Sequence, residues 1–174
     1  MENPESSVRQ HHQQAASGGA VRLAVVTVSD TRTPESDVNG QWLRQQITEM
    51  GNVVVHYQIV PDDPATIGTV LDSLLGTSAQ ILLFNGGTGI APRDNTFDAL
   101  SARLDKVMPG FGEIFRMLSY QQVGAAAMLS RAVAGVCQGR VLFSTPGSHA
   151  AVKLAWEKLI APELKHLAWE VNRL

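Results

Sequence analysis

A glycine-rich segment followed by polar residues is the part of this chain best suited to chemistry. It comes after an apolar run at 81–84 and consists of Gly86, Gly87, Thr88 and Gly89. Glycine adopts positive φ and has no Cβ, so a loop of this kind can turn sharply and point backbone N–H groups at a phosphate or carboxylate. Thr88 adds a hydroxyl donor. A loop that needs glycine only to turn is the simpler alternative, but the strand before it and the polar residues after it favour an anion site.

The carboxylate of Asp94 sets this segment apart from two common phosphate loops. No Lys-Ser/Thr pair follows the glycines as in a P-loop, and the Gly-x-Gly-x-x-Gly spacing of dinucleotide-binding loops is absent. A carboxylate beside a phosphate loop suits a site where a cation or a proton transfer accompanies the anion. A helix cap is the structural alternative for Asp94. Asn95 or Thr96 could cap the next helix instead, with Asp98 completing a capping box from Asn95.

Length and composition agree with one globular domain. The 174 residues are 44% hydrophobic, and the formal charge of −2 with scattered basic residues argues against a nucleic-acid partner. The single cysteine, Cys137, excludes an internal disulfide and a cysteine zinc site, which suits a reducing cytoplasm. No apolar stretch is long enough to span a bilayer, and the first residues lack the pattern of a signal peptide, so we expect no membrane association.

The chain divides into an arm and a domain. Residues 1 to about 20 are dominated by Ser, Gln and Gly with the pair His11-His12, and almost nothing there can pack. The two histidines lack the further ligands that a tetrahedral metal site needs. We therefore predict a disordered N-terminal arm at 1–20 and an α/β domain at 21–174.

The domain alternates strand and helix patterns. Apolar, β-branched runs predict strands at 22–28, 53–60 and 79–84, and amphipathic spacing predicts helices at 41–50 and 66–75. Beyond the glycines we expect a helix through Leu100 and Leu104, a break at Pro109-Gly110 and a helical segment at 111–119. Short strands at 132–136 and 141–144, joined by a turn at Gln138-Gly139, precede a long helical region. This order predicts a three-layer α/β/α fold with a mostly parallel central sheet.

Polar loops follow four of the expected strands. In open parallel sheets ligands collect at the carboxyl ends of strands, so the loops at 29–31, 61–63, 86–89 and 146–148 are expected to converge. Asp30 would then face the ligand, and Asp62 would be a second candidate metal ligand. Each aspartate is also explained by a helix cap or a turn, and the segment 146–148 by a helix-start turn.

Several ordered motifs together resemble the MoaB/MogA molybdopterin-binding family, over about residues 21–164. The stretches 111–120 and 130–135 favour the first of these two branches over the second. The motifs are Ser29-Asp30-Thr31-Arg32, Gly86-Gly87-Thr88-Gly89 with Arg93-Asp94-x-Thr96, Pro109-Gly110-Phe111-Gly112-Glu113, Leu129-Ser130-Arg131 and Pro146-Gly147-Ser148.

The resemblance implies a fold, an assembly and a reaction. It implies a three-layer α/β fold, trimers or hexamers, binding of molybdopterin, and contacts with other proteins of molybdenum cofactor biosynthesis. In active relatives, Mg-ATP adenylylates the terminal phosphate of molybdopterin and pyrophosphate is released. By this resemblance Asp94 matches the acidic residue essential for transfer and places Mg²⁺, and the glycine loop holds the phosphate. Weaker matches to the rim of the pterin pocket are Ser130, Arg131, Pro146, Gly147 and Ser148.

Two positions depart from the family pattern, and three functions stay open. Asn85 stands where relatives usually carry Thr, which predicts altered hydrogen bonds beneath the loop. The segment 146–149 lacks the second proline common in adenylyltransferases, so ligand binding is better supported than catalysis. The alternatives are a molybdopterin adenylyltransferase, a scaffold that holds the pterin without turnover, and, ranked last, an unrelated nucleotide-binding module.

One helical segment also bears on assembly. It is more apolar around its circumference than a surface helix should be, which predicts a place in a subunit interface or deep in the core. Its apolar residues are Phe111, Ile114, Phe115, Met117 and Leu118.

Overall fold

The structure, a computed structural model, describes residues 18–172. Residues 1–17 of the predicted arm lie outside the described residues, so the arm and the domain boundary near residue 20 stay predictions; Val21 is buried. In chain order the elements are β1 (Arg22–Val28), α2 (Val38–Glu49), β2 (Val53–Val60), α3 (Pro64–Leu75), β3 (Ile81–Asn85), α4 (Thr96–Ser101), β4 (Lys106–Val107), α5 (Pro109–Val123), the 3₁₀ helix η1 (Gly124–Leu129), β5 (Val133–Cys137), β6 (Arg140–Thr145), α6 (His149–Ala155), the π-helical turn η2 (Trp156–Ile160) and α7 (Ala161–Glu170).

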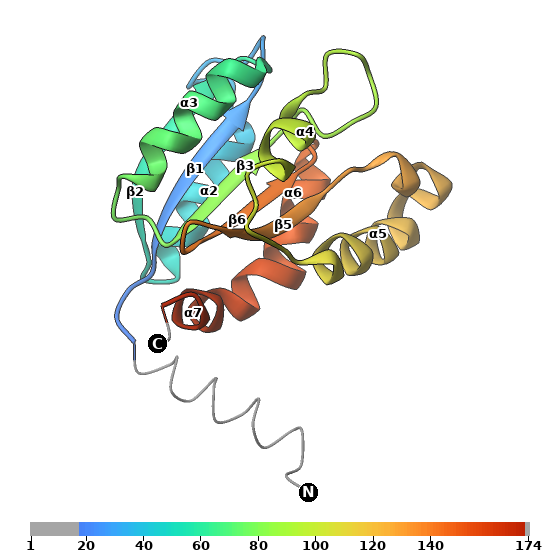
Figure 1. The fold of residues 1–174 in the computed structure, drawn as a ribbon. Helices are drawn as coiled ribbons and strands as arrows, with labels where there is room; N and C mark the ends of the chain where they lie inside the picture. The colour runs from blue at the N-terminus through green and yellow to red at the C-terminus, as the bar shows by residue number, and fades with distance from the viewer. Residues whose placement is uncertain (1–17, 173–174) are drawn as a thin grey trace, which may run out of the picture.

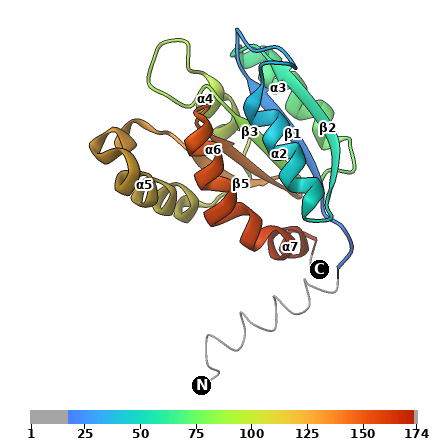
Figure 2. The same cartoon turned by 180° about the vertical axis from the view of Figure 1, so that it is seen from behind.

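The strands form one mixed sheet in the order β2-β1-β3-β6-β5-β4. The first four are parallel, β5 runs antiparallel to β6, and β4 runs antiparallel to β5. Helices α3 and α4 cover one face, and α2, α5 and α6 cover the other (Figures 1 and 2). The predicted α/β fold with a mostly parallel sheet between two helical layers is confirmed.

Each face of the sheet has its own hydrophobic core, because successive side chains of a strand point to opposite faces. Leu23 and Val25 of β1 pack in the cluster beneath α2, α5 and α6, which includes the fully buried Trp156. Ala24 and Val26 pack in the cluster beneath α3 and α4. Within residues 18–172, no helix combines the length and apolar character needed to cross a membrane.

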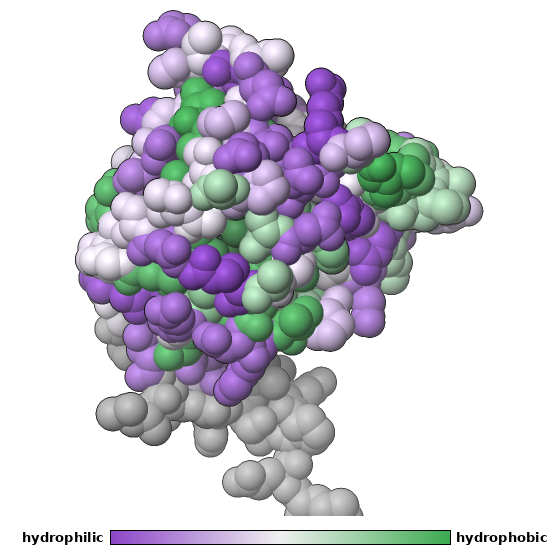
Figure 3. All heavy atoms as spheres, turned by 45° about the horizontal axis from the view of Figure 1, so that its top comes forward, coloured by the Kyte–Doolittle hydropathy of each residue, from purple (hydrophilic) through white to green (hydrophobic). Residues whose placement is uncertain are grey.

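Helix α5 differs from the sequence-based prediction at its start. Pro109 does not mark a break: it lies in the first turn of the helix, where its missing N–H costs no hydrogen bond. Phe115 is buried in the core, whereas Ile114 is 45% and Met117 is 57% exposed. Figure 3 shows hydrophobic residues gathered on the protruding edge at the right of the molecule. The helix is therefore a core element on one side and an uncovered apolar surface on the other.

The antiparallel end of the sheet begins with a tight hairpin. The expected turn between β5 and β6 is present at Gln138 and Gly139, whose φ angles are 45° and 74°. Positive φ at both central residues is what a type I′ turn requires, and this turn matches the twist of the two strands it joins.

Candidate functional site

The four polar loops lie together at the carboxyl edge of the parallel strands. The backbone N–H of Asp62 donates to Asp30 Oδ1 (3.1 Å), which joins the loops after β1 and β2. The N–H of Gly86 donates to the carbonyl of Thr145 (2.9 Å), which joins the loops after β3 and β6. The chain crosses from one side of β1 to the other between β2 and β3, so this edge also contains the point where strand order reverses.

Two glycines are dictated by close packing and by backbone conformation. Gly86 has φ +113°, and a Cβ there would lie 2.1 Å from the carbonyl oxygen of Val28. Gly87 has φ +62°, and a Cβ there would lie 2.2 Å from Asp62 Oδ2. Because neither position accepts a side chain, the loop presents backbone to this edge, as an anion-binding loop requires.

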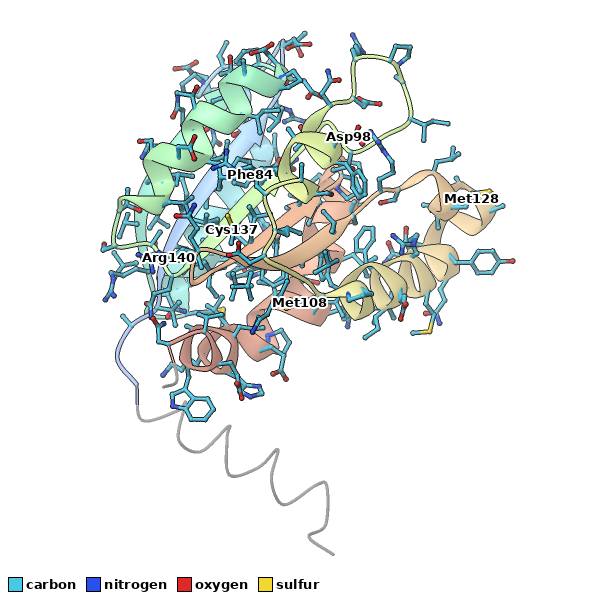
Figure 4. The ribbon with its side chains drawn as sticks, viewed as in Figure 1. Phe84, Asp98, Met108, Met128, Cys137 and Arg140 are labelled. Atoms are coloured by element: carbon cyan, nitrogen blue, oxygen red, sulfur yellow. The ribbon has the colours of Figure 1, made fainter. Side chains whose placement is uncertain are left out.

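Arg131 fastens the glycine loop from the far end of η1. Its Nε donates to the carbonyl of Gly89 (2.8 Å), and its Nη2 donates to the carbonyl of Asp94 (2.7 Å). Its Nη1 forms an ion pair with Asp98 Oδ2 (2.8 Å), which lies on α4 (Figure 4). The donors of the guanidinium thus hold the loop in its shape. The preceding residue, Ser130, is half-buried.

Asp94 is not the cap of α4. Its Oδ2 accepts a hydrogen bond from the N–H of Ala91 (2.9 Å) within the same loop. The alternative of a capping box from Asn95 is not realised: Asn95 occupies the N-cap position without a side-chain cap bond. Its amide instead donates to the carbonyls of Asp62 (3.3 Å) and Arg93 (3.0 Å). These two hydrogen bonds hold the side chain away from the N–H groups of the helix.

Asp62 lies against the glycine loop at Gly87, as Asp94 does at Gly89. Its Oδ1 accepts hydrogen bonds from the N–H of Asn95 and the hydroxyl of Thr96, both 3.2 Å away. Burial raises the pKa of Asp62 above its ordinary value, these two hydrogen bonds oppose the rise, and the charges of Asp94 and Asp30 add to it. The negative charges of Asp94 and Asp30 thus act on Asp62 beside a phosphate-type loop, and a cation would offset them.

The donor set fits a metal shared with a phosphate ligand. Among residues 18–172, no group of three or more His, Cys, Asp or Glu side chains is arranged to enclose a metal ion. Mg²⁺ in nucleotide sites commonly takes one or two carboxylates and completes its shell with phosphate oxygens and water. Asp62 and Asp94 are the carboxylates that could supply such a partial set.

A buried amide network that sequence reasoning missed lies beneath the loops. Asn39 of α2 donates from Nδ2 to Asn85 Oδ1 (3.2 Å) and to the carbonyl of Gly147 (2.8 Å). Asn85 donates in turn to the carbonyl of Val26 (3.1 Å) and to the hydroxyl of Thr27 (3.0 Å). Asn85 therefore takes part in the hydrogen bonds under the loop, and the change relative to a threonine at this position stays a prediction. Asn39 lies before the start of the helix predicted at 41–50, so no helical pattern marked it; α2 begins at Val38.

His149 is the exposed end of this network. Since Asn39 Nδ2 faces two acceptors, its Oδ1 faces His149 Nδ1 at 3.0 Å, which places the imidazole proton on Nδ1.

The remaining predicted residues lie at the same edge. Ser148 caps α6 by accepting from the N–H of Ala151 (3.3 Å), Pro146 is half-buried, and Thr88 is buried beneath the loop.

Comparison with known proteins assigns the chain to a family. Residues 24–166 match the family described as a probable molybdopterin binding domain. The chain belongs to this family. It is 48% identical to molybdenum cofactor biosynthesis protein B of Bacillus cereus, over 96% of this chain and 99% of that protein.

Solved structures agree with this assignment. A crystal structure of molybdenum cofactor biosynthesis protein B, 48% identical, superposes with a TM-score of 0.86 over 89% of this chain and 98% of the other. The tungsten cofactor synthesizing protein MoaB from Pyrococcus furiosus, 34% identical, gives 0.81 over 90% and 100%. The predicted MoaB branch of the family is thereby confirmed.

Proposed function

We propose that the chain binds molybdopterin at the carboxyl edge of the sheet and transfers the adenylyl group of Mg-ATP to its terminal phosphate. An oxygen of that phosphate attacks the α-phosphorus of ATP, a P–O bond forms, and the bond to the departing pyrophosphate breaks. The single observation that carries the proposal is the loop at Gly86 and Gly87, which has no room for side chains, with Asp62 and Asp94 beside it. This pairs an anion cradle with carboxylates that attract a cation.

Each group has a defined task in this reaction. Backbone N–H groups of the glycine loop after Gly86, whose own N–H donates to Thr145, bind phosphate oxygens, and Arg131 holds the loop in the shape that aims them. Asp94, with Asp62, would hold Mg²⁺, which offsets negative charge as one phosphate approaches another. The pterin would be bound by Ser130, Pro146, Gly147 and Ser148. Asp30 supports Asp62 by accepting a hydrogen bond from the backbone N–H of Asp62.

Asp94→Asn tests the proposal. Asparagine still accepts the hydrogen bond from Ala91, so folding and pterin binding are expected to survive. Lost charge near the metal is expected to raise the barrier for transfer by on the order of several kcal/mol. Pyrophosphate release from ATP, with and without molybdopterin, is the measurement. Asp63→Asn is the matched control, because Asp63 caps α3 at the same edge and asparagine caps equally well. Equal turnover in both variants would remove Asp94 from the machinery.

A pterin-binding role without turnover is the second candidate. It is favoured because one oxygen of Asp94 already accepts a bond within its own loop. If the wild type released no pyrophosphate, the binding role would replace the transfer, and Asp94→Asn should then weaken Mg²⁺-dependent ATP affinity. ATP binding that ignored pterin would instead indicate an unrelated nucleotide-binding module.

The uncovered apolar surface of α5 and η1 supports assembly into trimers or hexamers. Single exposed apolar residues are normal on a protein surface, but here several lie together. We infer that a second copy of the chain covers them. The exposed members of this surface are Ile114, Met117, Tyr120, Val123, Met128 and Leu129. Sedimentation is expected to give an oligomer at micromolar concentration, and a monomer would overturn this part of the proposal.

A cytoplasmic location, near other proteins of molybdenum cofactor biosynthesis, suits the single buried thiol of Cys137.

A further inference from the structure

The amino-terminal edge of the sheet contains a cavity that the proposed function does not use. It measures about 420 Å³ and lies between the starts of β1, β3 and β6 and the helix α7. Figure 4 labels Arg140 near this end of the sheet and Asp98 near the opposite end. A site here is therefore separated from the glycine loop by the length of the strands.

Three neighbouring strands bring two guanidinium groups to this cavity. Leu23 pairs with Ile81, and Ile81 pairs with Val141, so the residues that precede them stand in one row. That row is Arg22, Gln80 and Arg140. The backbone N–H of Gln80 donates to the carbonyl of Arg22 (2.7 Å), which fixes the order of the row.

The lining is strongly cationic. Arg22, Arg140 and Lys165 line the cavity, and among residues 18–172 no carboxylate lines it. Arg22 Nε donates to the carbonyl of Ser78 (2.8 Å), and Arg140 Nη2 reaches the carbonyl of Thr77 at 3.4 Å. Neither arginine forms an ion pair with any residue of the described chain. Three positive charges thus face one space that no acidic side chain of the described residues lines.

Arg140 also carries an unpaired donor. Its Nε is buried and has no hydrogen-bond partner among residues 18–172. An unpartnered buried donor costs about 1–3 kcal/mol, and folded proteins pair nearly all of them. An anion bound to this guanidinium would neutralise its charge, while the Nε itself has almost no surface that a ligand could reach.

We propose that this cavity is a second ligand site, which binds a small anion with two or more negative charges carried on phosphate or carboxylate groups. Planar guanidinium groups match both kinds of oxygen pair, and Lys165 from α7 adds a third charge from the opposite wall. The volume is within the range of small-molecule pockets. The inference is independent of the adenylyl transfer, because it uses none of the residues at the carboxyl edge.

Pyrophosphate and citrate are the probes, each titrated at constant ionic strength into the full-length wild type. Amide and indole signals in NMR spectra locate the binding, since pyrophosphate is also expected at the glycine loop. Shifts at Ser78, Gln80 and Trp169 are expected with at least one probe. Binding of both probes assigns the shared chemistry, and binding of one assigns phosphate or carboxylate. Shifts confined to the glycine loop would overturn the proposal.

Variants separate a built site from general charge attraction. Arg140→Met should weaken the binding at these signals at least tenfold, and Lys165→Gln about threefold. Lys153→Gln, which removes an exposed lysine of α6 outside the cavity, is the matched control and should change it little. Equal weakening in all three variants would mean non-specific attraction and would overturn the proposal. Lys165 is exposed, so its variant tests the site even if Arg140→Met folds poorly.

Discussion

The two ends of the sheet bind anions, in our proposals, by different means. At the carboxyl end the ligand groups are backbone N–H groups, held by glycines with no room for a Cβ and by buried amides. At the amino end they are the ends of long side chains, of which Arg22 and Lys165 are exposed. Binding and folding therefore depend on the same atoms at the first end, and on separate atoms at the second. Substitutions should reveal that difference.

The largest effect is expected from Gly86→Ala. The new Cβ would lie 2.1 Å from the carbonyl oxygen of Val28 at a φ of +113°, so strand β1 or the loop must move. We expect the free energy of unfolding to fall by about 3 kcal/mol or more. Gly110→Ala is the control, because nothing lies within 4 Å of its Cβ position in α5, and it should be neutral or slightly stabilising. Urea unfolding compares the two variants, and similar values would show that the glycine loop tolerates a side chain at Gly86.

Asn39→Ala should have the next largest effect. The substitution leaves Gly147 O and Asn85 Oδ1 without the donor they share, in a buried place. A loss of about 2–3 kcal/mol in the free energy of unfolding is expected. Gln45→Ala, at an exposed position of the same helix, should stay within about 0.5 kcal/mol. A loss no larger than that of the control would show that the loops do not depend on this amide.

Asp62→Asn should change how stability depends on pH. The pKa of Asp62 is raised in the folded chain, so its contribution to stability is complete at pH values below its unfolded pKa and is lost as pH rises through the folded pKa. Asparagine does not titrate. The variant should therefore gain stability relative to wild type between acid and neutral pH. Unfolding measured at a series of pH values tests the sign, and a relative loss toward neutral pH would contradict it.

Arg140→Met should have the smallest effect on folding. It removes a buried N–H without a partner and only one long hydrogen bond, to Thr77 (3.4 Å). The free energy of unfolding is expected to change by less than about 1 kcal/mol, in either direction. If Arg140→Met lowered the free energy of unfolding nearly as much as Gly86→Ala, under the same conditions, then the residues that bind the anion would also stabilise the fold at both ends of the sheet.

Local patterns predicted most of the sheet. The runs at Arg22–Val28 and Val53–Val60 begin and end where the strands do, because β-branched residues fill them and polar turns bound them. Parallel topology then predicted which loops meet. Pro109 misled because proline ends a helix interior but also suits a first turn. The two-residue strand β4 is too short to have a pattern of its own.

The hydrogen-bond partners of the site could not be predicted in the same way. Asn39 bonds to residues 46 and 108 positions away, and no periodicity relates them. Arg131 matched the family motif, but only the fold brings its guanidinium to Gly89, 42 positions earlier. Sequence therefore located the residues at the site, while their mutual contacts depend on how distant segments are packed.

The type I′ turn at Gln138 and Gly139 bears on the order in which the chain assembles. It lets β5 and β6 pair after closing a two-residue loop, whereas the parallel pairs of β1, β2, β3 and β6 must first bring ends of long crossovers together. Chain entropy therefore favours the hairpin as an early unit, with β6 as the strand on which β3 and then β1 can dock. The carboxyl edge that holds the glycine loop would be completed late, when that parallel half is in place.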